Sequence, residues 1–273
     1  MEEEFDIIIK NADIVDGSGS PRRKGDVGIR GGRFVKLDRV DGKAKRTIDG
    51  SGKVLCPGFV DPHNHADLFI FEEPLTPLLA QQGITTYACG NCGMSLVPSR
   101  DNNPYMKHLT RTFGITSFKE RESFGEWRSR VAGAGIALNM IPIAGHNTLR
   151  CEILGSSYIK PSTKKEVQDL GILVERVMEE GAWGVSLGLD GGTPGFFADF
   201  EELVEVGKRV SKYDGLLLPH TRHHQYNWAA SMNPEDTGYG IYYGSKSEAF
   251  FGRYHGHLEA IEIAEKSGVR LHI

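Results

Sequence analysis

The spacing of hydrophobic and polar residues changes near residue 58. Before that point the apolar residues come in short strand-like runs, at 5–10, 27–30, 33–37 and 46–49. Gly and Asp residues separate these runs, and the pair Gly31–Gly32 is typical of a β-hairpin turn. The pattern predicts that residues 1–57 form a small β unit without helices.

After residue 58, strand-like apolar runs alternate with helix-like segments. The strand-like runs are 59–60, 84–89, 136–143, 183–189, 216–219 and 269–273. The expected helices are 119–131, 163–180, 199–210 and 258–266. Thr163 and Glu166 have the spacing of a capping box, and Asp199 and Glu202 repeat it. Because parallel strands need a crossover connection, the alternation predicts an α/β fold with a parallel sheet.

Residues 58–273 therefore supply six strands, whereas a closed (β/α)8 barrel of the TIM type needs eight. The sixth strand reaches the last residue. We therefore expect a barrel seen only through about strand six, incomplete at its C-terminus, in a chain that is a piece of something longer. An open six-stranded sheet is the alternative. The expected domains are 1–57, a β subdomain, and 58–273, the barrel.

Composition narrows the classes of function. The chain has 273 residues, and its 32 Lys and Arg against 36 Asp and Glu give a net charge of −4, which argues against a nucleic-acid partner. No apolar run reaches the roughly 18 residues of a membrane helix. The first residues are acidic, unlike a signal peptide. Four cysteines are too few for a disulfide scaffold, so we expect a cytoplasmic protein.

His63 and His65 are the first candidate metal ligands, directly after the 59–60 strand. Residues two apart in an extended chain point to the same side, so both imidazoles can reach one ion. Neutral imidazole is a common zinc ligand. The end of a barrel strand is also where active sites lie in this fold. Two loop histidines without an ion are the alternative.

Cys89 and Cys92 form the second feature. A zinc ribbon would need another Cys-x-x-Cys pair, which Cys56 and Cys151 do not form. A thiolate ligand beside the histidines, a thioredoxin-like redox motif and a structural pair all remain open. Cys92 is favoured over Cys89 as a ligand, because the strand is still running at Cys89 whereas Cys92 lies past its end.

Further histidines occur later in the chain. His220 ends the fifth strand and faces the same mouth of a barrel, whereas His223 and His224 are expected in a solvated loop. His255 and His257 follow no strand, so we expect no ligand role for them. The polar segment 231–254 has the length of a lid or a disordered insertion.

Taken together, the motifs resemble the amidohydrolase superfamily, specifically its D-aminoacylase (N-acyl-D-amino-acid deacylase) branch. The motifs that carry the resemblance are 5–17, 57–65, 90–93, 145–150, 184–189 and 220–222. The match spans nearly the whole chain, and the joint order of the motifs is specific although each motif alone is not.

The resemblance implies a TIM-type barrel, a small β subdomain made from both chain ends, and one or two zinc ions. The ligand positions that carry over are His63, His65, Cys92 as a bridging cysteine, and His220. The family's sixth-strand histidine and its proton-shuttle aspartate are expected beyond Ile273. No catalytic residue is therefore expected within the chain, and His272 is not expected to be the missing ligand.

Two features bear on the branch of the family. Asp190 stands where relatives place a tyrosine, which bears on substrate preference. The hydantoinase and dihydropyrimidinase branch uses a carboxylated lysine on its fourth strand, and residues 183–189 contain no lysine. The hydantoinase branch therefore fits less well.

The function that the resemblance implies is zinc-dependent hydrolysis of a linear amide, specifically deacylation of an N-acyl-D-amino acid by metal-activated water. Its partner is a small-molecule amide, with neither nucleic acid nor membrane, and a homo-oligomer is left open. The alternatives are an amidohydrolase for cyclic amides, a non-catalytic metal-binding remnant and a redox protein built on Cys89 and Cys92.

Arg222, Arg150 and His146 are the candidate substrate-binding residues. An N-acyl-amino acid carries a carboxylate, and the planar fork of arginine matches a carboxylate with two hydrogen bonds. Arg222 is favoured because it lies two residues from His220. Structural salt bridges under the barrel rim are the alternative for both arginines.

Overall fold

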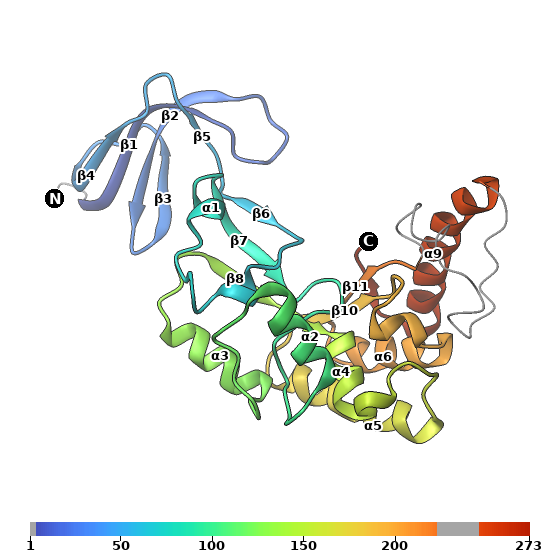
Figure 1. Cartoon of the computed structure of the whole chain (residues 1–273). Coiled ribbons are helices and arrows are strands. Elements are labelled where there is room, and N and C mark those ends of the chain that lie inside the picture. The colour runs from blue at the N-terminus through green and yellow to red at the C-terminus, as the bar shows by residue number, and fades with distance from the viewer. Residues whose placement is uncertain (1–3, 223–245) are drawn as a thin grey trace. The chain divides into compact units, whose positions relative to one another are not determined.

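The computed structural model describes residues 4–222 and 246–273 of the chain (Figure 1). Contacts divide the chain into two units, Met1–Phe59 and Val60–Ile273. The sequence pattern placed this boundary after residue 57. No helix among the described residues is long and apolar enough to cross a membrane.

The described part of the first unit consists of strands joined by turns. They are β1 (Glu4–Ile14), β2 (Arg23–Arg30), β3 (Arg33–Asp38), β4 (Lys43–Asp49) and β5 (Val54–Leu55). The sheet has the order β3-β2-β1-β4, with β5 also paired to β1. Gly31 and Gly32 join β2 to β3 with φ angles of 58° and 71°, which glycine adopts without a steric penalty. The predicted hairpin is confirmed.

The second unit is built on parallel strands. They are β6 (Phe59–Asp61), β7 (Ile84–Cys89), β8 (Asn139–Pro142), β9 (Ala144–Gly145), β10 (Gly184–Gly188), β11 (Leu216–His220) and β12 (Arg270–Leu271). The orders β6-β7-β8 and β9-β10-β11-β12 both follow the chain. The Ile143 N–H donates to the Cys89 carbonyl at 3.0 Å, so β8 and β9 form one interrupted strand beside β7. Strands therefore lie at all six predicted runs.

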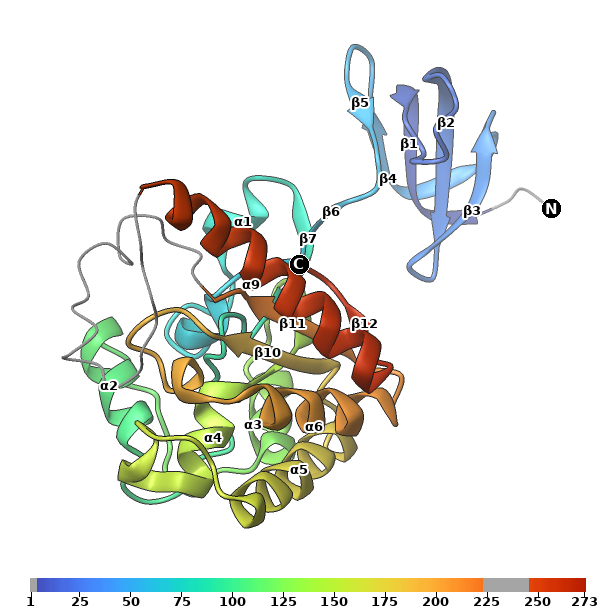
Figure 2. The ribbon, with the colours of Figure 1, turned by 90° about the vertical axis from the view of Figure 1, so that its right-hand side faces the viewer.

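Helices connect these strands (Figures 1 and 2). They are α1 (Pro77–Ala80), α2 (Pro104–Phe113), α3 (Phe124–Gly133), α4 (His146–Leu154), α5 (Lys164–Glu179), α6 (Phe200–Ser211) and α9 (Lys246–Ser267). Short 3-10 turns are η1 (Ala66–Phe69), η2 (Gly155–Ser157) and η3 (Pro194–Phe197). Helices α2 and α4 were not predicted, and α3 begins at Phe124 rather than at 119 because Ser123 caps it.

The two predicted capping boxes have different outcomes. Thr163 accepts from the Glu166 N–H at 3.3 Å, and the Glu166 carboxylate accepts from the Thr163 N–H at 2.7 Å, so the box at α5 is confirmed. At α6, Asp199 accepts from the Glu202 N–H at 2.8 Å. The Glu202 side chain does not complete the box, because it pairs with buried residues of α4 instead.

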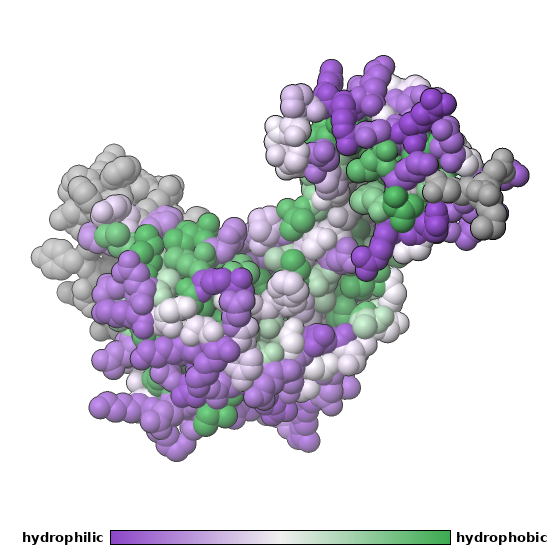
Figure 3. Space-filling view, turned by 180° about the vertical axis from the view of Figure 1, so that it is seen from behind, coloured by the Kyte–Doolittle hydropathy of each residue, from purple (hydrophilic) through white to green (hydrophobic). Residues whose placement is uncertain are grey.

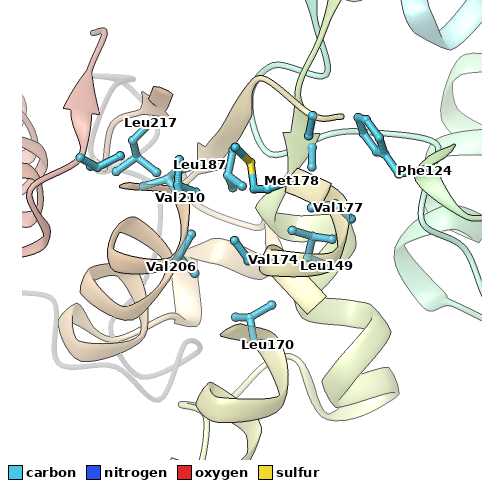
Figure 4. Close-up of a cluster of buried hydrophobic side chains, with 14 of the residues drawn as sticks. Phe124, Leu149, Leu170, Val174, Val177, Met178, Leu187, Val206, Val210 and Leu217 are labelled. Atoms are coloured by element: carbon cyan, nitrogen blue, oxygen red, sulfur yellow. The ribbon is translucent and has the colours of Figure 1, made fainter. Parts of the chain in front are cut away.

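One large core lies between the strands and helices of the second unit (Figure 4). Its members include Leu149, Leu170, Val174, Val177, Met178, Leu187, Val206, Val210 and Leu217. Full burial of each such side chain stabilises the fold by about 1.5–3 kcal/mol. The packed helices hold β10 beside β11, where Gly188 pairs with His220. Hydrophobic residues also reach the surface, as the green patches in Figure 3 show.

Leu170 and Ile172 on α5 offer a matched test of this packing, because Leu170 is fully buried and Ile172 is 61 % exposed. We expect Leu170→Ala to lower the free energy of unfolding by about 2–5 kcal/mol. Ile172→Ala should change it by about 0.5 kcal/mol or less. Urea denaturation followed by tryptophan fluorescence measures both, and equal losses would contradict the assignment of α5 to the core.

Candidate metal centre

His63 and His65 lie in the turn that follows β6. The Asp61 carboxylate shapes this turn by accepting from the His63 N–H at 3.1 Å and from the Asn64 side-chain amide at 2.8 Å. The two imidazoles stand nearly perpendicular, with ring centroids 5.4 Å apart. His63 is exposed and His65 is half-buried. The turn therefore brings both rings together at the end of the strand.

Cys92 lies in the loop that follows β7. Its Sγ is 3.3 Å from His63 Nε2 and 3.3 Å from His220 Nδ1. The side-chain amide of Asn91 donates to the Asn64 carbonyl at 3.2 Å, which ties this loop to the histidine turn. The thiol sulfur, in the loop after β7, is therefore close to one residue that follows β6 and to one that ends β11.

The donor set fits a metal ion. The ligand atoms of His63, His65 and Cys92 all lie within 4.8 Å of one another. His65 Nδ1 is buried without a hydrogen-bond partner among the described residues. Such burial costs free energy unless the nitrogen finds another partner, such as a metal ion. Imidazole nitrogen and thiolate sulfur are the donors that zinc prefers. Among the predicted residues, the structure thus brings together His63, His65, Cys92 and His220.

Burial sets the protonation of the first two histidines. Burial, with smaller contributions from the nearby His63 and His220, lowers the pKa of His65 to about 4. Burial also lowers the pKa of His63, with a contribution from His220. Both imidazoles are therefore neutral at pH 7, the form that binds a metal.

His220 has the opposite shift. Its Nε2 lies 3.5 Å from Asp190 Oδ2, and Asp190 and then Cys92 raise its pKa to about 9. From the sequence, Asp190 was identified only as a departure from the family pattern and not as a site residue. Its place just after β10, beside the end of β11, is the signal that could have assigned it to the site. His272 also belongs to the surroundings of the site, because its charge contributes to lowering the pKa of His63.

Cys89 and Cys92 have different surroundings. Cys89 ends β7, is 1 % exposed, and its Sγ lies 3.8 Å from the Ile141 carbonyl. Burial raises the pKa of the Cys89 thiol well above its usual range, and the nearby Asp67 raises it further. Such a thiol does not readily form the thiolate that binds metals. This contrast favours Cys92 as the ligand.

Asp67 and Tyr87 are buried polar residues near the site that the sequence analysis missed. Burial raises the pKa of Asp67 to about 7 and raises the pKa of the Tyr87 hydroxyl well above its usual range. Asp67 Oδ1 and the Tyr87 hydroxyl are buried without a hydrogen-bond partner among the described residues. The position of Asp67 two residues after His65 is the only signal in the sequence.

His146 and Arg150 are not part of the Cys92 group. Both are fully buried on α4, and the Glu202 carboxylate accepts from Arg150 Nε at 2.9 Å and lies 2.8 Å from His146 Nε2. Other guanidinium nitrogens of Arg150 donate to the carbonyls of Tyr158 and Lys160. These contacts favour the structural salt bridge over the substrate-binding role predicted for both residues.

Arg222 also has protein partners. Its Nε donates to the Glu259 carboxylate at 2.9 Å, and its other nitrogens donate to the carbonyls of Phe196 at 2.6 Å and Ala198 at 3.0 Å. The arginine thus links η3 to α9, which favours the salt-bridge alternative here as well. His255 and His257 are exposed on α9. His223, His224 and most of the 231–254 segment lie outside the described residues.

Comparison with known proteins shows what this chain is similar to. No protein-family model matches the chain. D-aminoacylase from Alcaligenes xylosoxydans xylosoxydans is 33 % identical over 221 residues, which is 80 % of this chain and 44 % of that protein. The chain is a homologue of the D-aminoacylases. The resemblance read from the motifs is confirmed, and the chain spans less than half the length of this curated relative.

Two solved structures share the fold. A structure of D-aminoacylase, described for its binuclear metal centre, matches with a TM-score of 0.78 and 27 % identity, covering 98 % of this chain and 50 % of that one. N-acyl-D-glutamate deacylase from Bordetella bronchiseptica, complexed with zinc and a phosphonate inhibitor, matches with a TM-score of 0.74 and 27 % identity, covering 98 % and 58 %. This homologue of the D-aminoacylases thus shares the mixed α/β fold of both deacylase structures over nearly its whole length.

The Glu202 network provides a test of the structural role of α4. Glutamine at position 202 leaves the Arg150 guanidinium buried without a countercharge. We therefore expect Glu202→Gln to lower the free energy of unfolding by about 3–5 kcal/mol. Asp169→Asn breaks the exposed Lys165–Asp169 pair on α5 and should have little effect. Similar losses in urea denaturation would contradict the buried network.

Comparing Glu202→Gln with the wild-type protein also tests how the free energy of unfolding depends on pH. Burial alone would raise the pKa of Glu202, but His146, Arg150 and Ser162 outweigh it and lower the pKa to about 2. A lowered pKa in the folded state adds stability above the ordinary value of 4.5, and this stability is lost as the pH falls toward 2. Glu202→Gln should therefore flatten the fall in unfolding free energy between pH 5 and 2. An unchanged slope would contradict the assignment.

Proposed function

We propose that this chain forms most of a metal centre that hydrolyses the amide bond of N-acyl-D-amino acids. The proposal rests on one observation. Cys92 Sγ lies 3.3 Å from both His63 Nε2 and His220 Nδ1. A thiolate and imidazoles are donors that zinc prefers. Homology to D-aminoacylase, one structure of which is described for its binuclear metal centre, supports a metal centre here.

The proposed scaffold is a (β/α)8 barrel, of which this chain supplies the first six strands. Parallel strands that pair in chain order support it. The candidate ligands support it too, because they follow β6 and β7 and end β11, at the carboxyl edge where barrel enzymes carry their active sites. Residues 1–59 are proposed to contribute to the small β subdomain.

Each candidate ligand has a distinct role in this proposal. His63 and His65 would hold an ion with neutral imidazoles, together with the Cys92 thiolate and His220. A bound zinc ion would supply Lewis-acid chemistry, lowering the pKa of its bound water toward neutrality and polarising a carbonyl. One or two ions are compatible with the donor set. Asp190 holds the His220 ring from the side opposite Cys92.

The names of the homologues support a linear N-acyl-D-amino acid as the substrate. The relatives act on N-acyl-D-amino acids as D-aminoacylase and N-acyl-D-glutamate deacylase. A cyclic amide is the weaker candidate, because the Gly184–Gly188 strand has no lysine to carboxylate. Since Arg150 and Arg222 are engaged by protein groups, we propose that the substrate carboxylate is recognised by other residues.

The activity is tested on the protein from its complete reading frame, loaded with zinc. We expect release of free amino acid from the N-acetyl derivatives of D-methionine, D-aspartate or D-glutamate. The L enantiomers and hydantoin, a cyclic amide, are the controls. Hydrolysis of hydantoin alone would replace the proposal with the cyclic-amide alternative, and no hydrolysis of any amide with zinc bound would favour a non-catalytic metal-binding protein.

The metal assignment is tested with matched cysteine variants of the same protein. Cys92→Ser should lose most of one equivalent of bound zinc, because an alcohol does not replace a thiolate ligand. Cys89→Ser should keep zinc near the wild-type content, since Cys89 is buried away from the histidines. Elemental analysis after dialysis measures the zinc content of both variants. A larger loss of zinc in Cys89→Ser than in Cys92→Ser would contradict the assignment.

A further inference from the structure

Ser186 lies at the centre of β10 and has no role in the proposed chemistry. It is fully buried, and it belongs to the Gly184–Leu189 motif that the sequence analysis singled out. Its hydroxyl contacts a loop more than 90 residues earlier in the chain, the loop that carries Cys92. The contacts of this buried hydroxyl suggest that it helps to position the Cys92 loop.

The Cys92 loop has a backbone that needs support. Cys92 has a φ of 54°, in the left-handed region that a side chain disfavours. Gly90 and Gly93 on either side of it have φ angles of 82° and 72°. A backbone of this kind persists where surrounding contacts determine it.

Ser186 supplies two of those contacts. Its Oγ accepts a hydrogen bond from the Gly93 N–H at 2.9 Å and donates one to the Gly90 carbonyl. A single hydroxyl therefore joins the residues on both sides of the Asn91–Cys92 pair. The distance between the two ends of the loop is set by one side chain of a neighbouring element.

Two further contacts fix the loop against the same elements. The Asn147 side-chain amide donates to the Cys92 carbonyl at 3.4 Å, while its oxygen accepts from the Gly195 N–H at 2.7 Å. A Cβ at Gly188 would lie 2.2 Å from the Cys92 carbonyl oxygen, so only glycine lets β10 approach the loop this closely. The loop is thus docked on β10 and α4.

We infer that Ser186 is a positioning residue for Cys92, whose hydroxyl bridge between Gly90 and Gly93 holds Sγ between His63 and His220. The inference rests on the proposed metal function. Removing the hydroxyl leaves the Gly93 N–H and the Gly90 carbonyl without this buried partner, so the loop moves to satisfy them. Metal affinity responds strongly to residues that orient the ligands.

Ser99 provides the matched control. Its hydroxyl is also buried, donating to the Lys119 carbonyl at 2.9 Å and accepting from the Glu122 N–H at 3.3 Å. Ser99→Ala therefore removes one donated and one accepted hydrogen bond, as Ser186→Ala does, at a place away from Cys92. The pair separates loss of stability from loss of ligand placement.

The experiment substitutes cobalt(II) in the protein from its complete reading frame and records the near-ultraviolet charge-transfer band between thiolate and metal. Both alanine variants should lower the melting temperature of the metal-free protein. Only Ser186→Ala should weaken metal binding, by about 10–100-fold, and reduce the band. Ser186→Thr, which keeps the hydroxyl, should restore both.

Each outcome decides the inference. An unchanged band and affinity in Ser186→Ala, or equal losses in Ser99→Ala, would overturn it. If Ser186→Ala does not fold, Asn147→Ser gives the milder form of the test, and an unchanged band there would also count against the loop-docking argument. A wild-type band that persists in Cys92→Ser would instead overturn the proposed metal centre, which keeps the two failures distinct.

Discussion

The parallel hydrogen-bond ladder is the constraint on which the candidate site depends. Parallel pairing in chain order brings the carboxyl ends of successive strands to one edge, so residues 63 and 220, far apart in sequence, approach the same sulfur atom. The ladder alone does not place a side chain to within a bond length. The Asp61 turn, the Asn91 tether and the contacts of β10 with the Cys92 loop supply that accuracy.

Charge is distributed unevenly around the sulfur. Burial keeps His63 and His65 neutral, whereas Asp190 and Cys92 favour the protonated form of His220. His63 and His65 would therefore bind a metal ion without losing a proton, whereas His220 and the Cys92 thiol would each have to lose one. The buried Arg150–Glu202 pair lies apart from this balance and stabilises the packing of α4 against α6.

Much of the fold could be predicted because local chemistry decides it. The six apolar runs, the Gly31–Gly32 hairpin and the Thr163 cap depend on residues close in sequence. Helix α2 was missed although Asn103 caps its start and Gly114 ends it, whereas other failures arise where distant residues decide. Helix α4 is buried over nearly its whole length, so it lacks the polar face that reveals a helix in a sequence. Glu202 has the spacing of a capping box, yet a buried arginine 52 residues away takes its carboxylate.

The candidate site also divides into residues that the local sequence reveals and residues that only the folded chain reveals. Residue type and a place just after a strand were enough to select His63, His65, Cys92 and His220, because metal ligands are limited to a few side chains. The arginines were assigned on residue type and on their places just after histidines at strand ends, and neither reveals that Glu202 and Glu259 already neutralise them. Ser186 could not be selected, since serine is common and its partners lie in a distant loop. Asp190 has the signal of a place just after a strand, but its partner His220 ends a different strand. What the sequence leaves out is therefore the set of residues that orient the ligands, and these act only through neighbours that folding brings together.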